Sequence, residues 1–313
     1  MKYFLSCDWG TSSFRLKLVE RGSLKTLAEV QNNQGIASTN LQWQEAKGQS
    51  RFLFYTSVIA SAVTMLEKKQ NNSLSGVPVI LSGMASSTLG MIQLPYKQLP
   101  FRVDGSDLKV ERVEASKDFG HDVFVISGVC SGVDVMRGEE TQLVGSVDDD
   151  STADTLYIFP GTHSKHISVK DGIAHDFRTF MTGEIFALLA KNSTLTQSLG
   201  DPADGINIEG FVAGVKDSMN SNILHQLFHV RSRFLLDNRE PEDNRGYLSG
   251  VLIGSEVQDL ARSKMERIVI VSSGMGDHYN MAMQALKIGI PVSIISDRDV
   301  AVQGQVRIVS RFA

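Results

Sequence analysis

The chain has 313 residues, of which 42% are hydrophobic and 21% charged, and its formal net charge is −4. This composition predicts a globular protein of about two domains, and the scattered basic residues argue against nucleic-acid or anionic-membrane partners. Cys7 and Cys130 lie in apolar stretches and indicate buried thiols. We expect a cytoplasmic protein with neither signal peptide nor membrane span.

The first half predicts strands followed by helices. Apolar runs and alternation predict a helix at 50–69 and strands at 2–8, 14–20, 25–32 and 77–83. The proline-punctuated stretch 84–106 predicts loops, a further strand ends at Gly128, and a helix begins near Gly138. The acidic segment 146–154 predicts a loop, and we place the domain boundary there, giving domains at 1–147 and 148–313.

The second half partly repeats this order. A strand, a Gly-Thr turn and a returning strand are followed by a third strand that ends near Phe180. Helices are predicted at 184–197, 205–219, 222–230, 247–263 and 277–288, with a strand at 267–274. A short strand, PVSIIS, precedes a C-terminal helix that carries Ala301 and Gly304.

The N-terminal segment FLSCDWGTSSFRLKL is the most informative stretch. A buried strand ends on Asp8, the turn Gly10–Ser13 follows, and alternating apolar residues from Phe14 predict an antiparallel return. Glycine lets backbone N–H groups approach a phosphate, and the Asp can hold Mg²⁺ directly or through water. An ordinary hairpin turn fits these residues equally well.

The second half contains the same motif in TLYIFPGTHSKHISVK, and a later turn, VSSGMG, follows another strand. Two strand–turn–strand motifs suit a nucleotide whose phosphates are gripped from two sides, with the later turn covering adenosine. This organisation resembles the actin, hexokinase and Hsp70 superfamily of ATP-binding proteins. The resemblance implies an α/β fold with two ribonuclease-H-like domains and an interdomain cleft.

Longer strings carry a closer resemblance. They are LSGMASS (81–87), LPY (94–96), MRGEETQLVG (136–145), PGTHSKHI (160–167), DFRTFMTGE (176–184) and LSGVLIGSEV (248–257). In order and spacing they resemble the 2-dehydro-3-deoxygalactonokinase family over the whole chain. The family phosphorylates the 6-hydroxyl of 2-dehydro-3-deoxy-D-galactonate with ATP, in D-galactonate breakdown.

The resemblance implies ATP and Mg²⁺ as cofactors and assigns nucleotide-binding residues to the three turns. Asp8 would hold Mg²⁺, directly or through water. The residues expected to bind phosphates or nucleotide are Gly10, Thr11, Ser12, Gly161, Thr162, His163, Ser164, Gly274 and Gly276.

Phosphoryl transfer also needs a carboxylate that orients the attacking hydroxyl and accepts its proton. Glu139, directly after Gly138, is our candidate, because related sugar kinases place a Gly-Asp there. Glu140 is the rival, since successive helical residues point about 100° apart and only one can face the substrate. Acidic capping of the helix N-terminus explains the pair without any catalytic role.

The acid substrate calls for an arginine that binds its carboxylate in a bidentate manner. Arg137 and Arg178 are the candidates within the family-like strings, and a salt bridge is the alternative role of each. Asp176 and Thr179 are expected to bind sugar hydroxyls, and so is Ser86, which follows a buried strand.

Other site types find little support. His163 and His166 are three apart on a predicted strand and face opposite ways, and no cysteine pair completes a zinc set. Neither a P-loop nor a G-x-G-x-x-G motif is present.

Three alternatives remain open: a kinase for the gluconate-derived acid, a non-catalytic sugar-acid sensor and a phosphohydrolase. A sensor would be expected to lose Asp8 or the acidic pair, both of which this chain keeps. Exopolyphosphatases usually keep an acidic residue where this chain has Pro160. We also expect a homodimer, because two-fold dimers are the commonest oligomers.

Overall fold

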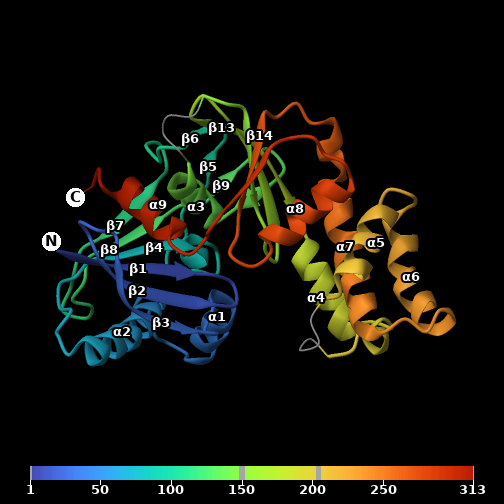
Figure 1. Cartoon of the computed structure of the whole chain (residues 1–313). Coiled ribbons are helices and arrows are strands. Elements are labelled where there is room, and N and C mark those ends of the chain that lie inside the picture. Colours follow the sequence, from blue (N-terminus) through green and yellow to red (C-terminus); the bar gives the residue numbers. More distant parts are fainter. Residues whose placement is uncertain (1, 148–151, 202–205, 313) are drawn as a thin grey trace. The chain divides into compact units, whose positions relative to one another are not determined.

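The computed structural model describes residues 2–147, 152–201 and 206–312 (Figure 1). Residues 148–151 of the predicted acidic loop at 146–154 lie outside these residues. The chain forms two compact units. One comprises 1–152, 169–176 and 297–313, and the other comprises 153–168 and 177–296. The C-terminal helix therefore belongs to the first unit, whereas the predicted division at 147/148 assigns it to the second.

The first unit is built on a six-stranded sheet. Its order is β3 (Thr26–Asn32), β2 (Phe14–Glu20), β1 (Tyr3–Trp9), β4 (Val79–Gly83), β8 (Val123–Ile126) and β7 (Val110–Val113). The first three strands along the chain form an antiparallel meander, whereas β4 runs parallel to β1 and β8 runs parallel to β4. The carboxyl ends of β1 and β4 thus meet at one edge of the sheet, where open α/β sheets bind ligands.

Helices cover both faces of this sheet (Figure 1). On one face, Leu5, Cys7 and Trp9 pack in a core with the buried side of α2 (Arg51–Gln70). On the other face, Gln305 of α9 (Val300–Val309) donates hydrogen bonds to the Cys7 carbonyl at 3.0 Å and to Ser82 Oγ at 2.9 Å. Cys7 and Cys130 are buried free thiols, as predicted.

The helix α9 also packs on α3 (Glu139–Ser146), and glycines let the two backbones touch. A Cβ on Gly304 would lie 1.8 Å from the Thr141 carbonyl oxygen, and a Cβ on Gly145 would lie 1.9 Å from that of Val300. Since real Cβ atoms do not approach so closely, both positions require glycine. This contact fixes the start of α3 against the sheet.

The second unit repeats the strand order of the first. Its strands are β15 (Val292–Ile295), β14 (Arg267–Val271), β11 (Thr155–Phe159), β12 (Ser164–Lys170) and β13 (Ile173–Phe180). β14 runs parallel to β11 and β15 runs parallel to β14, as β4 and β8 do beside β1. Each unit has the predicted ribonuclease-H-like arrangement. The segment 169–176, from the end of β12 to the start of β13, is counted with the first unit, where β6 (Phe101–Arg102) pairs with the start of β13.

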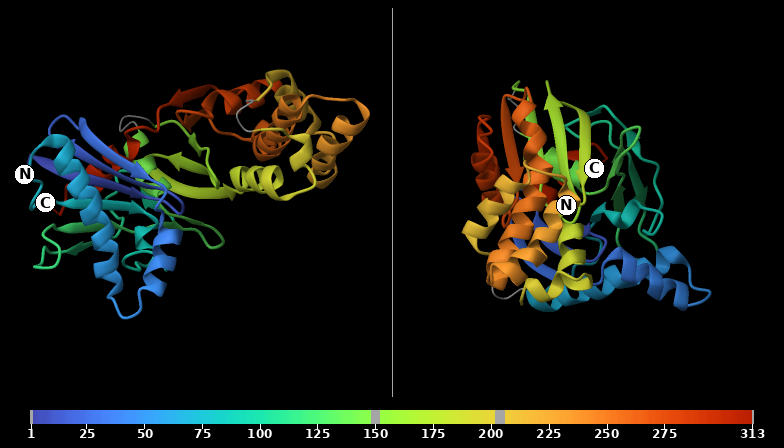
Figure 2. Two further views of the ribbon diagram at one scale, coloured as in Figure 1. Left: turned by 90° about the horizontal axis from the view of Figure 1, so that it is seen from below. Right: turned by 90° about the vertical axis from the view of Figure 1, so that its right-hand side faces the viewer.

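The second unit differs from the first in its helices, which gather at one end of its sheet (Figures 1 and 2). They are α4 (Thr182–Asn192), α5 (Ile208–Asp217), α6 (Ile223–Leu236), α7 (Pro241–Val257) and α8 (Gly276–Ala285). The predicted helix at 247–263 in fact begins at Pro241. A proline at the first helical position, with Glu242 and Asp243 in the first turn, favours that earlier start.

Several short elements are absent from the sequence prediction. The stretch 84–106, predicted as loops, contains a 3₁₀ turn at Met84–Ser86 and two-residue strands, β5 (Lys97–Gln98) and β6. β5 pairs with β9 (Val129–Cys130), which pairs with β10 (Val135–Met136). The helix α1 (Ile36–Glu45) is also unpredicted, because its mixed polar sequence has a weak pattern and tertiary contacts fix its start.

Candidate active site

The turn Gly10–Ser13 joins β1 to β2, and the start of α1 braces it. Gly10 N–H donates to the Ser13 carbonyl at 2.9 Å, which closes the predicted hairpin. The Ile36 N–H donates in turn to the Gly10 carbonyl at 2.9 Å. A Cβ on Gly35 would lie 2.3 Å from the Thr11 carbonyl oxygen, so only glycine allows this approach. Thr11 and Ser12 themselves are exposed.

The carboxyl ends of β1 and β4 meet the start of α3. Gly83, with φ +81°, packs so closely that a Cβ would lie 2.8 Å from the Trp9 carbonyl oxygen and 3.4 Å from Asp8 Oδ1. Gly138, with φ +109°, faces Gly83 in turn, and a Cβ on Gly138 would lie 3.4 Å from the Gly83 Cα. These contacts bring Asp8 and the helix start that carries Glu139 to one place.

A small polar pocket of about 40 Å³ opens beside Asp8. Ser6 and Gln142 line it, together with the cations Arg15 and Lys17. Burial raises the pKa of the Asp8 carboxyl, and the two cations oppose that rise. Oxygen donors around the half-buried Asp8 carboxylate, with Asp297 also lining the pocket, suit Mg²⁺, which proteins usually hold through one or two carboxylates and the substrate phosphates. Both neighbouring cations are already ion-paired, Arg15 with Glu29 at 3.3 Å and Lys17 with Asp299 at 3.3 Å.

The two glutamates at the start of α3 have different surroundings. Glu140 is 1% exposed, and its carboxylate oxygens accept hydrogen bonds from the Gly138 N–H at 2.7 and 2.9 Å. Thr141 Oγ1 donates to the same carboxylate at 3.0 Å. Burial, aided by the Glu139 charge, raises the pKa of Glu140 to about 8. Glu140 therefore caps the start of its own helix, whereas Glu139 is half-buried.

Arg137 links three family-like strings. Its Nη1 donates to Ser86 Oγ at 2.6 Å and its Nη2 donates to the Leu94 carbonyl at 3.2 Å. The guanidinium also stacks on the Tyr96 ring, 3.9 Å from the ring centroid. Both terminal nitrogens are thus engaged within the protein. Through them Arg137, directly before Gly138, is tied to the loops after β4.

Arg178, the other arginine candidate, lies on β13 and is far more open. Its side chain is 64% exposed and makes a 3.6 Å ion pair with Asp259, which is itself exposed. Asp176 shares its strand face, whereas Thr179 points to the opposite face, because neighbouring residues on a strand alternate. The structure therefore separates Thr179 from the other two candidates.

In the second unit, the turn Gly161–His163 joins β11 to β12 and is braced in the same way as the first turn. A Cβ on Gly183, at the start of α4, would lie 2.4 Å from the Gly161 carbonyl oxygen. The Glu184 N–H donates to the Thr162 carbonyl at 2.9 Å, and the Glu184 carboxylate contacts His163 Nε2. Gly183 thus corresponds to Gly35 in the first unit.

A buried polar network beneath this turn is missing from the sequence prediction. Glu256 of α7 lies 2.9 Å from His166 Nε2 and accepts hydrogen bonds from Tyr279 at 2.8 Å and from Thr182. Tyr279 reaches Ser164 Oγ at 2.9 Å. A glutamate within the apolar run LSGVLIGSEV is the signal that could have pointed to it. Three family-like strings meet in this network.

The two glycines of the third turn differ in role. Space around Gly274 is open, with no atom within 4 Å of its Cβ position, whereas a Cβ on Gly276 would lie 2.6 Å from Ile294 Cγ2. Ser272 Oγ accepts from the Met275 N–H at 3.0 Å and shapes the turn. Gly274 therefore leaves room for a ligand, and Gly276 packs α8 against β15.

No helix among the described residues has the length and apolar character needed to cross a membrane.

Known proteins resemble this chain over nearly its whole length. The profile of the 2-keto-3-deoxy-galactonokinase family matches residues 8–308. The 2-dehydro-3-deoxygalactonokinase of Escherichia coli K12 is 30% identical, over 97% of this chain and 96% of its own length. A protein of Rhizobium meliloti 1021, named a probable 2-dehydro-3-deoxygalactonokinase, is also 30% identical, over 90% of this chain and 89% of its own.

Among solved structures, one from Sinorhizobium meliloti, described as a candidate 2-dehydro-3-deoxygalactonokinase, superposes with a TM-score of 0.83. It is 26% identical and covers 99% of this chain and 96% of its own. The likeness confirms the predicted actin- and hexokinase-like fold. With the family profile matching almost end to end, the chain belongs to the 2-keto-3-deoxy-galactonokinase family.

Proposed function

We propose that this protein transfers the γ-phosphoryl group of ATP to the 6-hydroxyl of 2-dehydro-3-deoxy-D-galactonate, in D-galactonate breakdown. The products are ADP and 2-dehydro-3-deoxy-6-phosphogalactonate. Family membership supports the reaction. The observation that supports the residue roles is the close packing of Gly83 against Asp8 and of Gly138 against Gly83, near the helix start that carries Glu139.

In this proposal the attacking group is activated from the first unit. The Glu139 carboxylate orients the 6-hydroxyl and accepts its proton while oxygen attacks phosphorus and the bond to the ADP oxygen breaks. Asp8 would hold Mg²⁺, directly or through water, and the bound ion would neutralise part of the phosphate charge. Arg15 and Lys17, which line the pocket at Asp8, would exchange their ion pairs with Glu29 and Asp299 for the remaining negative charge of the phosphates.

The glycine turns would bind the nucleotide. Thr11 and Ser12 are exposed above the braced first turn, and Gly161 to Ser164 form the second. Open space at Gly274 suits a nucleoside, whereas the buried position of Gly276 suits packing. Of these two glycines we therefore propose only Gly274 for contact with the nucleotide.

For the substrate carboxylate we propose Arg178 in preference to Arg137. The terminal nitrogens of Arg137 are already used by Ser86 and Leu94, while Arg178 is exposed and pairs only at 3.6 Å with Asp259. Exchange of that weak surface pair for a bidentate carboxylate costs little. Arg137 and Ser86 would then shape the loop that receives the sugar hydroxyls.

The direct test is release of ADP by the purified protein with 2-dehydro-3-deoxy-D-galactonate, with the gluconate-derived epimer, and with no acid. We expect ADP only when an acid is present, a higher kcat/KM for the galactonate-derived acid, and phosphorus NMR signals of a 6-phosphate ester. ADP release without acid would indicate a phosphohydrolase instead. Binding of the acid without ADP release would indicate a sensor.

A further inference from the structure

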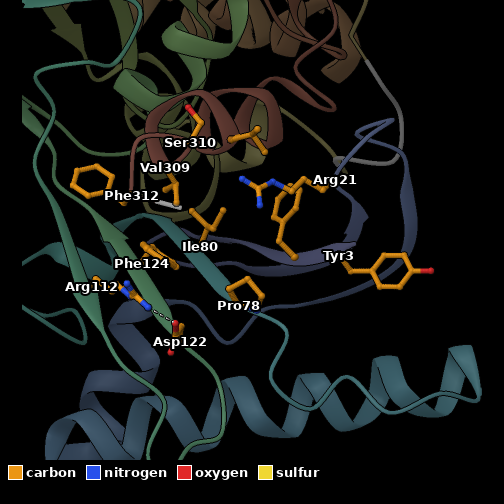
Figure 3. A pocket seen from close by; sticks show the side chains of 12 residues that line it. Tyr3, Arg21, Pro78, Ile80, Arg112, Asp122, Phe124, Val309, Ser310 and Phe312 are labelled. Carbon is orange, nitrogen blue, oxygen red and sulfur yellow. Dashed lines mark hydrogen bonds and ion pairs between the residues drawn. The ribbon is translucent and has the colours of Figure 1, made fainter. Parts of the chain in front are cut away.

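The first unit has a second cavity, at the end of its sheet opposite Asp8 (Figure 3). Its volume is about 310 Å³. The side chains come from the amino-terminal parts of three parallel strands and from the last turn of α9, whereas Asp8 and Gly83 stand at the strands' carboxyl ends. The apolar lining includes Phe4, Ile80, Phe124, Val306, Val309 and Phe312. Pockets of about 300 Å³ or more with mostly apolar walls and a few polar groups are typical small-molecule sites.

Two arginines give this cavity a positive rim. Arg112 donates to Asp122 at 2.9 Å and lies over the Phe124 ring, so its charge is already balanced. Arg21 is exposed, and its guanidinium extends across the cavity toward Ser310 (Figure 3). Within the described residues, Arg21 makes no ion pair with a carboxylate. One uncompensated cation over an apolar floor is complementary to a single negative charge on an apolar body.

We propose that this cavity binds a small organic monoanion with an aromatic or branched apolar body. The site goes beyond the proposed function, because a sugar acid covered with hydroxyls has no apolar body and ATP carries several charges. The carboxylate would pair with Arg21, and the body would cover Phe4, Ile80 and Val309. Burial of apolar area supplies most of the affinity, and the arginine sets the orientation.

The test is calorimetric titration of the full chain with 4-phenylbutyrate. We expect saturable binding at one site per chain, unchanged by saturating ATP or sugar acid. 4-Phenyl-1-butanol, which lacks the charge, and butyrate, which lacks the ring, should each bind at least about tenfold more weakly. Equal binding of the alcohol would overturn the role of Arg21 and with it the proposal.

Variants locate the site. Arg21→Gln should weaken binding by about tenfold, whereas Lys25→Gln, which removes an exposed cation from the same β2–β3 connection, should leave it unchanged. Ser310→Phe adds bulk at an exposed lining position and should abolish binding, with the melting temperature as a check on folding.

Absence of saturable binding to the wild-type chain overturns the proposal. So does an equal effect of Arg21→Gln and Lys25→Gln. If 4-phenylbutyrate fails to bind and Ser310→Phe converts a dimer to a monomer, the occupant is a second copy of the chain, and the proposal is wrong.

Discussion

At the scale of single residues, the two adjacent glutamates of α3 show how position along one helical turn separates two roles. Glu140 folds back onto the Gly138 N–H and is buried, whereas Glu139 is half-buried. The sequence predicts that only one of them can face the substrate. Its spacing alone does not say which, because both residues fit acidic capping of a helix start.

The proposed base gives the first prediction. Glu139→Gln is nearly isosteric, so substrate binding and melting temperature should persist, while kcat should fall by about 10²-fold or more because no group accepts the hydroxyl proton. Glu140→Gln should cost far less activity, since Glu140 is occupied by the helix start. Steady-state kinetics and melting curves of both variants decide the point. A crippled Glu140→Gln beside an active Glu139→Gln would reverse the assignment.

A second prediction concerns pH and the buried glutamate. The pKa of Glu140 is raised from 4.5 to about 8, so between these values the folded state holds a proton that the unfolded state has lost. The stabilisation is therefore full at low pH and disappears as pH rises through about 8. The melting temperature of the wild-type protein should fall more between about pH 5 and about pH 8 than that of Glu140→Gln. Parallel pH profiles for the two proteins would contradict a raised pKa at this site.

Asp8 carries the third prediction. Asp8→Asn keeps the shape of the half-buried side chain but removes the carboxylate charge proposed to hold Mg²⁺, so kcat should fall at saturating Mg²⁺ while the fold persists. Ser6→Ala, which alters the same pocket without removing a carboxylate, is the matched control. Measuring kcat against Mg²⁺ concentration tests this. Near-normal turnover of Asp8→Asn at saturating Mg²⁺ would remove Asp8 from the metal side.

At the scale of elements, glycines decide how close helices and turns come. Gly35 and Gly183 each let the start of a helix press on a turn, and Gly145 and Gly304 each let α3 and α9 touch. Such contacts are hard to predict from sequence, because a glycine in a helix or turn has many possible reasons. The strands are easier to predict: the apolar runs ending at Asp8 and Gly83 leave little else for those residues to form.

The α3–α9 contact gives the fourth prediction. Gly304→Ala would place a methyl group 1.8 Å from a backbone oxygen, so the helices must separate. Overpacking of this kind costs about 1–3 kcal/mol and sometimes more. Gly22→Ala, which meets nothing within 4 Å, should change stability by less than about 0.5 kcal/mol. Urea unfolding of both variants provides the comparison. Equal midpoints would mean that the helices do not need this close approach.

At the scale of the whole molecule, chain order and spatial grouping differ. Composition and the repeated strand–turn–strand motif predict two α/β halves, and each unit has that fold. The prediction of two consecutive domains at 147/148 cannot anticipate that 297–313 joins the first unit. A C-terminal amphipathic helix shows in its sequence that it has a buried face, but not which sheet buries it.

The fifth prediction follows from that grouping. A chain ending at Ser296 lacks α9, so Cys7 and Ser82 lose the hydrogen bonds from Gln305, and the sheet face beneath α9 becomes exposed. Limited proteolysis should then cut rapidly within residues 2–147, while fragments from 177–296 persist. A chain ending at Ser310 keeps α9 and should resist cleavage like the full chain. If both truncated chains resist equally, the first unit does not depend on α9.

The second cavity of the first unit, shown in Figure 3, also affects how this protein is handled in the laboratory. Tyr3 and Phe312, from opposite ends of the chain, line the same hollow. An affinity tag at either end therefore begins beside that hollow, so tags of both kinds should be cleaved before any screen for ligands there. The same closeness makes the protein a candidate for circular permutation, in which a short peptide joins the two ends and a new start is opened in an exposed loop.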